Sequence, residues 1–426
     1  MGESKERTAD TSRLRILVVQ PTGDRMGHYG IYTVKLCQAL GRQGHAVTLC
    51  TNRIYPERYI REPLAFTVYE VEGGRLSFEP YERQLSRFEP YYWWGHFKTS
   101  LRIASEALWL CRSQQFDVVY MSDVEFLMAS LVAKRIRGAV PPIVIGVSAA
   151  NFTFDTYPGS LPKRVYKVLQ REVFRRTLGR EIQAISILGE WHRERLRSQL
   201  RLPDDFPIVV IPDGAGDAGP AIAQREARDR LGITHAGPLL LFFGMLRRDK
   251  GIEGLIEGVS RVPRDDWRLL VAGFPMDYSV QEINTLVARY RVRDRVILRL
   301  EYISDGEVPL YYYASDGVAF PYASFYTGGS GPLMKGACTY GKPVIASAVS
   351  EMGRLVEEHS IGLTSAPDDV FSLADTLRQF FELPKERRAE MAERALALGR
   401  ANSWDAMAER FSHLFTDLVR TRMVTG

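Results

Sequence analysis

The sequence predicts an α/β protein made of two doubly wound domains, each with a parallel sheet. Three observations predict this fold class. Short apolar runs alternate with longer amphipathic segments along both halves of the chain, which is typical of parallel strands connected by helices. Two turns rich in basic or glycine residues stand between a strand and a helix in the second half. The chain has 426 residues, 45% of them hydrophobic, which is enough to bury two cores.

In the first half, the apolar run at residues 14–20 predicts the first buried strand. Similar runs, which predict the next strands, occupy residues 46–51, 65–71, 118–121 and 143–147. Amphipathic segments, which predict the helices between them, occupy residues 32–42, 96–112 and 125–137. Helices between successive strands imply parallel strands, so both faces of the sheet are expected to be covered.

The second half begins with the apolar run 238–243, which predicts a buried parallel strand before a basic turn and an amphipathic helix that starts at Ile252. A helix start offers unpaired backbone N–H groups and the positive end of the helix dipole, and Arg247 and Lys250 add two full charges. The turn therefore predicts an anion site that fits a diphosphate. Taken alone, it is equally consistent with a solvated surface turn.

A glycine-rich loop at residues 327–332 follows a predicted strand at 316–322 and precedes a predicted helix at 333–340. Glycines let the backbone approach a ligand closely, and the helix start again favours negative charge. Because this loop lies in the same half of the chain as the basic turn, it strengthens the prediction of a phosphate site. The remaining predicted elements of this half are helices at 280–290 and 370–381 and a strand at 341–346.

Together these segments resemble the donor half of the GT-B glycosyltransferases, specifically the retaining family four, or group 1 glycosyl transferases. Family members read F-x-G-R-(three residues)-K-G, then D-x-x-x-x-P, then an E-x7-E loop, then G-x-P-V-I-A. Segments similar to the first, second and fourth patterns stand at residues 242–251, 316–321 and 341–346. Segments similar to the family's first strand, glycine loop and helix stand at residues 18–21, Gly27 and 44–47. Its interdomain junction and the start of its terminal helix have similar segments at residues 210–214 and 402–404.

The resemblance implies two Rossmann-like domains that face a cleft, and a C-terminal helix that returns to the first domain. It implies an acceptor-side domain at residues 1–207, a sugar-nucleotide domain at 208–401 and the returning helix at 402–426. The donor-binding residues that it implies are Gly273, Tyr302, Ile303, Gly328, Gly329, Ser330, Gly331 and Pro332. The candidates on the acceptor side or in the cleft are Gly27, His28, Asp123, Ser148 and Asn151, all of which have residue types that are also common in caps and loops.

The sequence departs from the family pattern at several positions. With Gly341 as anchor, the two glutamates of E-x7-E fall on Gly328 and Gly336, where the family contacts the donor sugar and the ribose. The family arginine falls on Met245, although a subgroup places it where Arg247 stands. The acceptor-side histidine and the second glycine of the first loop are also absent from their expected positions. These departures predict an unusual donor or a degenerate site.

The resemblance implies transfer of a hexosyl or related group in bacterial glycan biosynthesis, with retention of the anomeric configuration. The acceptor is a glycan, a lipid-linked sugar or a small molecule. Arg247 and Lys250 are the predicted catalytic groups, because they can stabilise the charge that develops on the departing diphosphate. No carboxylate pair stands in a suitable context, so we expect no metal, and no cofactor besides the nucleotide-diphosphate sugar. Two alternatives are a non-catalytic sugar-nucleotide or glycan-binding subunit and a sugar-nucleotide epimerase.

Charge is distributed unevenly along the chain. Residues 1–212 contain 30 Lys and Arg against 22 Asp and Glu, whereas the remainder contains 26 against 29. A basic stripe, Lys163, Lys167, Arg171 and Arg175, recurs every four residues of one predicted helix, with Leu169 expected on another side. Such a stripe is either a solvated face or a contact for anionic lipids or a polyanionic acceptor. Nucleic acid is not expected, because no binding module accompanies the charge.

The cysteine spacing and the lack of long apolar runs indicate the cellular compartment of the protein. The four cysteines show no paired or metal-like spacing, which predicts buried thiols in a reducing environment. No apolar run approaches the roughly 18 residues that a membrane span requires. Residues 1–13 are polar, which does not fit a secretory signal. We therefore expect a cytoplasmic protein, with peripheral contact at the inner face of the membrane as a further hypothesis.

Overall fold

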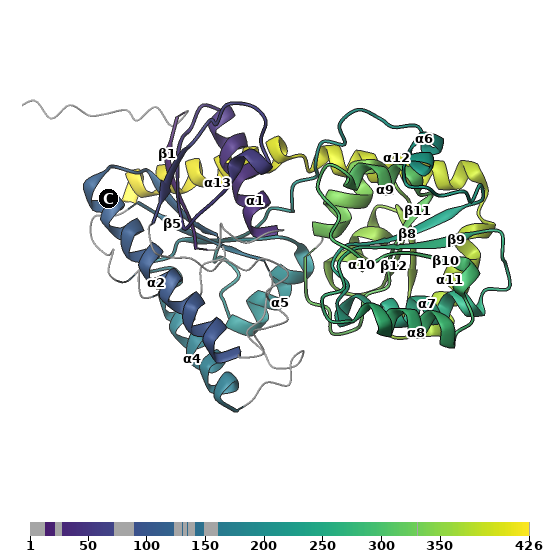
Figure 1. Ribbon diagram of the computed structural model, residues 1–426. Coiled ribbons are helices and arrows are strands. Elements are labelled where there is room, and N and C mark those ends of the chain that lie inside the picture. The colour runs from purple at the N-terminus through teal and green to yellow at the C-terminus, as the bar shows by residue number, and fades with distance from the viewer. Residues whose placement is uncertain are drawn as a thin grey trace, which may run out of the picture. The chain divides into compact units, whose positions relative to one another are not determined.

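A computed structural model of the chain describes residues 13–21, 28–71, 89–122, 130, 134, 141–148, 161–329 and 331–425. Strands and helices alternate along both halves. The chain divides into two units, Met1–Pro212 with Trp404–Gly426, and Asp213–Ser403. Figure 1 shows the elements of each unit. The predicted α/β class with two doubly wound parallel sheets is confirmed.

In its described residues, the first unit contains a seven-stranded parallel sheet. Its strands, in spatial order, are β3 (Thr67–Glu70), β2 (Ala46–Thr51), β1 (Arg15–Gln20), β4 (Val118–Ser122), β5 (Ile143–Val147), β6 (Ala184–Ile187) and β7 (Ile208–Val210). Successive side chains of β1 enter opposite cores: Leu17 and Val19 belong to one cluster, and Ile16 and Val18 to the other. Both faces of the sheet are therefore buried.

Helices cover both faces of this sheet. One face carries α2 (Glu89–Ser113), α4 (Leu161–Thr177) and α5 (Glu190–Leu200), and the other carries α1 (His28–Arg42) and α13 (Trp404–Thr425). The ring of Phe411 in α13 lies 4.9 Å from the ring of Tyr120 in β4. Asp405 of α13 forms an ion pair with Arg42 of α1 at 2.6 Å. The C-terminal helix therefore returns to the first domain, as predicted.

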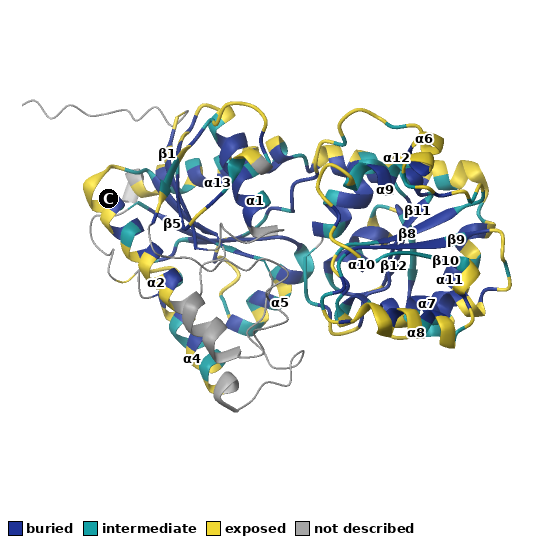
Figure 2. Ribbon diagram, in the orientation of Figure 1, coloured by how far each residue is buried: buried dark blue, intermediate teal, exposed yellow. Residues whose placement is uncertain are grey.

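In the second unit, the described residues form a six-stranded parallel sheet. Its strands, in spatial order, are β10 (Val296–Arg299), β9 (Arg268–Ala272), β8 (Leu239–Phe243), β11 (Gly317–Phe320), β12 (Val344–Ser347) and β13 (Gly362–Ser365). The helices on one face are α7 (Ile252–Arg261), α8 (Val280–Arg289) and α11 (Val370–Glu382). Those on the other are α6 (Gln224–Arg230), α9 (Val308–Ala314), α10 (Ser350–Glu358) and α12 (Lys385–Ala401). Figure 2 shows buried strands between helices whose outer sides are exposed.

Several element boundaries differ from the sequence-based expectation. Helix α1 begins at His28 rather than at residue 32, and α2 begins at Glu89 rather than at residue 96. The predicted helix at 333–340 contains a π-helix, Leu333–Cys338, in which the Thr339 hydroxyl donates a hydrogen bond to the Met334 carbonyl at 2.8 Å. Single π turns are often found at functional sites, and apolar periodicity does not reveal them. Of the predicted helix at 125–137, the structure describes only residues 130 and 134, both helical.

Candidate functional site

The strand order of the second sheet locates a candidate site at the carboxyl edge between β8 and β11. From β8 the chain proceeds outward through β9 to β10, and then returns to place β11 on the other side of β8. Ligands of open α/β sheets bind at such a reversal, outside the carboxyl ends of the strands. The two turns singled out in the sequence, after β8 and after β11, both lie at this edge.

The basic turn after β8 packs directly on the end of β11. Residues Arg248–Lys250 form a short 3-10 helix that ends at Gly251, whose φ is 69°. A Cβ atom on Gly251 would lie 1.8 Å from the carbonyl oxygen of Pro321. The backbone N–H of Ala323 donates a hydrogen bond to the Asp249 carbonyl at 3.0 Å. Only glycine permits this approach, which joins the ends of the two central strands.

The two cations predicted from the sequence have different surroundings. Arg247 is partly exposed and donates two hydrogen bonds to the Asp249 carboxylate, at 3.0 and 2.7 Å. Lys250 is only 9% exposed, and no described carboxylate lies within ion-pair distance of its ammonium group. Burial, reinforced by the charge of Arg247 and opposed by that of Asp249, lowers the pKa of Lys250 to about 8. A bound anion would offset the cost of this buried charge.

Two tyrosines form the wall beside Lys250. The Lys250 ammonium lies 5.6 Å from the ring centre of Tyr322, and the rings of Tyr322 and Tyr326 lie 4.5 Å apart. The Tyr326 hydroxyl donates to the Gly329 carbonyl at 3.3 Å, whereas the buried Tyr322 hydroxyl has no hydrogen-bond partner among the described residues. Burial raises the pKa of both phenols, so both are neutral at physiological pH. The site therefore combines cations with neutral hydroxyl groups.

Gly273, a predicted donor residue, lies next to Gly244, which in turn adjoins Lys250. Its φ is 144°, and a Cβ atom there would lie 1.9 Å from the carbonyl oxygen of Gly244. A Cβ atom on Gly244 would in turn lie 3.3 Å from the Lys250 ammonium nitrogen. The ends of β8 and β9 therefore approach each other closely beside Lys250, because Gly244 and Gly273 have no side chains.

Tyrosine hydroxyls occupy the space beside the two glycines that replace the family glutamates. A Cβ atom on Gly328 would lie 2.3 Å from the hydroxyl of Tyr326, and one on Gly336 would lie 2.3 Å from the hydroxyl of Tyr312. The Tyr312 ring stacks on Tyr340, with centroids 4.7 Å apart. Any side chain at either glycine would require a tyrosine to move. The pattern of the sequence does not reveal these contacts, because Tyr312 reaches Gly336 through tertiary packing and Tyr326 reaches Gly328 through the conformation of their shared loop.

The glycine loop is tied to neighbouring segments of the same unit. The Ser350 hydroxyl donates to the Gly328 carbonyl at 3.5 Å, while Gly331 and Pro332 begin the helical segment. Lys335 of the π-helix lies 3.8 Å from the buried carboxylate of Asp213. Neither Lys335 nor Asp213 was among the predicted site residues. Asp213 lies in the junction motif at 210–214, which could have indicated it, whereas the sequence gives no signal for Lys335. Ser330 lies outside the described residues.

Tyr302 and Ile303 are less central than the sequence comparison implies. Both follow β10, which is the edge strand and lies two positions from β8. Ile303 is buried in the core cluster that also contains Leu310 and Tyr311. Tyr302 is 41% exposed. The structure therefore assigns Ile303 a packing role and leaves the donor-binding role of both residues as a prediction.

The acceptor-side candidates are only partly described. Gly27, Asp123 and Asn151 lie outside the described residues, as does the side chain of His28, the first residue of α1. Ser148 directly follows β5 and is partly buried. The reversal of strand order in this unit falls between β1 and β4, so the acceptor side of the site remains a prediction at that edge.

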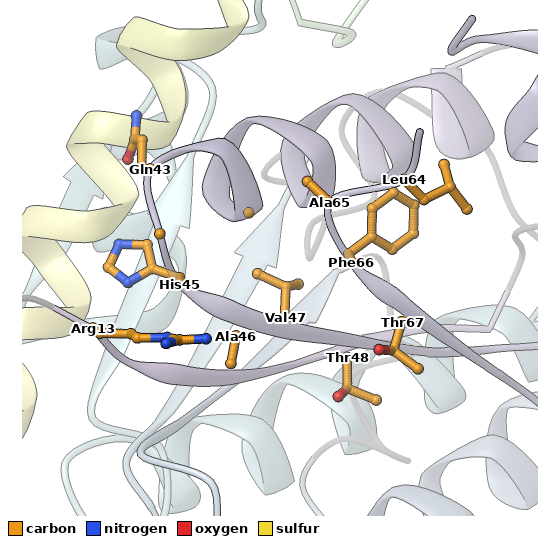
Figure 3. Close-up of a pocket in the computed structure, with 12 residues that line it drawn as sticks. Arg13, Gln43, His45, Ala46, Val47, Thr48, Leu64, Ala65, Phe66 and Thr67 are labelled. Atoms are coloured by element: carbon orange, nitrogen blue, oxygen red, sulfur yellow. The ribbon is translucent and has the colours of Figure 1, made fainter. Parts of the chain in front are cut away.

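A shallow hollow of about 910 Å³ lies in the first unit, at the amino-terminal ends of β2 and β3. Figure 3 shows Val47, Ala65 and Phe66 among its lining residues. His45, also in its lining, accepts a hydrogen bond from the Leu14 N–H at 3.1 Å and contacts the Ser412 hydroxyl at 2.9 Å. This hollow lies at the amino ends of the strands, whereas ligands of such sheets bind at the carboxyl ends.

No group of three or more His, Cys, Asp or Glu residues in the described ranges is arranged to hold a metal ion. Among the helices that the structure describes, none is long and apolar enough to cross a membrane.

Comparison with known proteins identifies the activity. Residues 29–214 match the model of the glycosyl transferase 4-like domain, and residues 223–397 match that of the glycosyl transferases group 1. A D-inositol 3-phosphate glycosyltransferase of Xylanimonas cellulosilytica is 25% identical over 94% of both chains. The α-D-kanosaminyltransferase of Streptomyces kanamyceticus is 24% identical over 67% of this chain and 72% of its own. The protein is a glycosyltransferase.

Solved structures confirm the fold of this glycosyltransferase. Sucrose-phosphate synthase from Thermosynechococcus elongatus superposes with a TM-score of 0.74, at 19% identity, over 96% of this chain and all of the other. HepE from Anabaena, solved in complex with UDP-glucose, gives a TM-score of 0.68 at 16% identity, over 95% of this chain and all of its own. The GT-B architecture predicted from the sequence is confirmed, and the relatives do not favour a non-catalytic subunit.

Proposed function

We propose that this glycosyltransferase transfers a sugar from a nucleotide-diphosphate sugar to a hydroxyl group of its acceptor, and that Arg247 and Lys250 bind the diphosphate. The observation that carries the proposal is the buried Lys250 ammonium, which has no described carboxylate within ion-pair distance and lies where the strand order reverses. Arg247, the nearby neutral phenols and the close-packed glycines complete a surface suited to an anion.

The chemistry requires stabilisation of a leaving group. The bond between the anomeric carbon and the diphosphate oxygen breaks, a bond forms to the acceptor oxygen, and the acceptor hydroxyl gives up its proton. Negative charge develops on the diphosphate, and cations already held in place stabilise it without reorganisation. Lys250 and Arg247 supply these charges in the proposal, and no metal ion is required. The resemblance to the retaining family supports retention of the anomeric configuration.

The donor contacts differ from those of the family in this proposal. The positions of the two family glutamates are glycines whose neighbouring space holds the hydroxyls of Tyr326 and Tyr312. Phenol hydroxyls can donate and accept hydrogen bonds without carrying charge. HepE binds UDP-glucose, which makes a UDP-sugar the first donor to test.

Three kinds of acceptor remain in the proposal: a glycan, a lipid-linked sugar or a small molecule. The names of the relatives mention D-inositol 3-phosphate and 2-deoxystreptamine, which supports polyhydroxylated small molecules as the first to test. The proposal includes a cytoplasmic location with peripheral contact to anionic lipid. The exposed arginines of α4 support this contact, which favours a lipid-linked acceptor. Such a contact should weaken as salt screens the charges.

Donor hydrolysis and transfer assays with UDP, GDP, ADP, CMP and dTDP sugars, in excess EDTA, test the proposal. We expect turnover with one nucleotide class and the same anomeric configuration in donor and product by NMR. Arg247→Ala should lose most activity, whereas the matched variant Arg248→Ala should keep it, because Arg248 is exposed and pairs with Glu253 and Glu282. Equal activity of both variants, or activity restored only by Mn²⁺, would overturn the phosphate assignment.

A further inference from the structure

Exposed apolar side chains are concentrated on two helices of the first unit. The described part of the chain has eleven exposed large hydrophobic residues, and five of them lie on α2 and α4: Leu101, Trp109, Val165, Val168 and Leu169. Scattered surface hydrophobics are ordinary, but a concentration of them marks an interaction surface. Both helices pack on the same core cluster, through Ala104 and Phe174, so both cover one face of the sheet (Figure 2).

Helix α4 has distinct buried and exposed apolar sides. Gln170, Phe174 and Thr177 are buried against the unit. Val165, Val168 and Leu169 are 62%, 48% and 52% exposed, and their spacing of three and four residues places them on one strip of the helix. The sequence places Leu169 on another side of the helix from the basic stripe. The structure exposes that side, so this apolar strip has no covering element among the described residues.

Arginines flank the apolar side chains on both helices. Arg175 and Arg176 of α4 are exposed and share Glu172, at 3.0 and 3.1 Å, so these three residues together leave one positive charge. On α2, exposed Arg102 and Arg112 lie close in sequence to Leu101 and Trp109. Helices with Trp or Leu on one side and basic residues beside it bind in the interface plane of anionic membranes. A bilayer offers both chemistries, acyl chains for the apolar strip and phosphates for the arginines.

We propose that α2 and α4 form a membrane-binding face, in which Trp109, Val165, Val168 and Leu169 enter the acyl boundary of an anionic bilayer. The inference rests on the proposed electrostatic contact with anionic lipid and adds an apolar component to it. Charge attraction is screened by salt, whereas burial of apolar surface is not. Binding should therefore have a salt-sensitive part that the arginines supply and a salt-resistant part that the apolar strip supplies.

Sedimentation of the full chain with phosphatidylcholine vesicles, with and without phosphatidylglycerol, separates these parts. In salt of about 0.15 M both parts act, and in about 1 M only the apolar part remains, since the screening length falls from about 8 to about 3 Å. We expect wild type to bind acidic vesicles at both salt concentrations. The double variant Val168→Ser with Leu169→Ser should lose about tenfold or more of its binding in high salt. The matched control Phe371→Ser, at an exposed residue of the second unit, should bind as wild type does.

Tryptophan fluorescence gives a second measurement. Quenching by brominated lipid should be smaller in Trp109→Phe than in wild type, because the variant lacks the indole that the proposal places at the acyl boundary. If the double serine variant binds in high salt as wild type does, the apolar contact is overturned. Loss of low-salt binding on charge reversal at Arg171 and Arg175 would then still support the electrostatic contact. The proposal is also overturned if wild type binds no vesicles and light scattering shows a dimer that the double serine variant does not form. That result would show that a second copy of the chain covers this face.

Discussion

Basic side chains occur in two contrasting environments in this protein. Lys250 in the turn after β8 is 9% exposed, and burial lowers its pKa to about 8. Arg175 and Arg176 on α4 are exposed and share an acidic neighbour, Glu172. A buried cation is costly to hold and gains much from a bound anion, whereas exposed ion pairs contribute about 0–1 kcal/mol and are screened by salt. Basic side chains are thus expected to dominate ligand binding in the buried turn and to contribute only a salt-sensitive attraction on the surface of α4.

The largest expected effect is that of Lys250→Ala. Removing a preorganised charge of this kind should lower kcat/KM for the donor by roughly 100-fold or more, by comparison with the loss of one oxyanion donor. The fold should survive, because the unfavourable buried charge is removed with the side chain. Steady-state kinetics and thermal melting measure the two quantities. Activity within a few-fold of wild type would place the phosphate site elsewhere. It would also show that the buried Lys250 contributes no more to ligand binding than an exposed cation does.

Gly273→Ala should have the next largest effect. The new Cβ atom would lie 1.9 Å from the Gly244 carbonyl oxygen at a φ of 144°, so the ends of β8 and β9 must separate beneath Lys250. We expect a loss of a few kcal/mol of unfolding free energy and weaker donor binding. Gly254→Ala in α7 is the control, because its Cβ would meet only Val370, at 3.9 Å, and should be neutral or stabilising. Equal melting temperatures for the two variants would contradict the close approach.

The pH dependence should show opposite signs for binding and stability. Donor affinity should fall above a pH of about 8, where unliganded Lys250 loses its proton. The free energy of unfolding should rise between about 8 and 10.5, because the unfolded chain still binds the proton that the folded chain has released. Calorimetric binding and chemical denaturation across this range, each compared with Lys250→Ala, isolate the contribution of this residue. A pH profile identical to that of the variant would show that Lys250 does not titrate there.

The smallest effect on stability is expected from reversal of charge at Arg171 and Arg175. Surface substitutions change stability by no more than about 0.5 kcal/mol, so the melting temperature should hardly move. Binding to acidic vesicles at low salt should nevertheless fall steeply. Arg225→Glu, at an arginine that is 94% exposed in the second unit, is the control. If the reversed variant and wild type sediment equally on acidic vesicles, these arginines form only a solvated face.

The basic turn was more predictable than the contacts that surround it. The turn with Arg247 and Lys250 is local, since one strand, one turn and one helix determine it, and apolar periodicity with glycines reveals such a unit. The tyrosines beside Gly328 and Gly336 were not predicted: Tyr312 meets Gly336 through the packing of separate segments, and Tyr326 meets Gly328 through the conformation of their shared loop, which apolar periodicity does not reveal. The exposure of Leu169 was not predicted either, since periodicity identifies the sides of a helix but not which side finds a partner.

By itself, the sequence determined the α/β class, the alternation of strands and helices, and the two cations of the basic turn, because these depend on short-range periodicity and turn chemistry. Only the tertiary structure decided that Lys250 is buried with no described carboxylate within ion-pair distance, while Arg247 pairs with Asp249. It also decided that phenol hydroxyls adjoin the positions of the family glutamates, and that α4 exposes an apolar strip. Burial, pKa and partner choice depend on the atoms that surround a side chain, and most of those atoms come from distant parts of the chain.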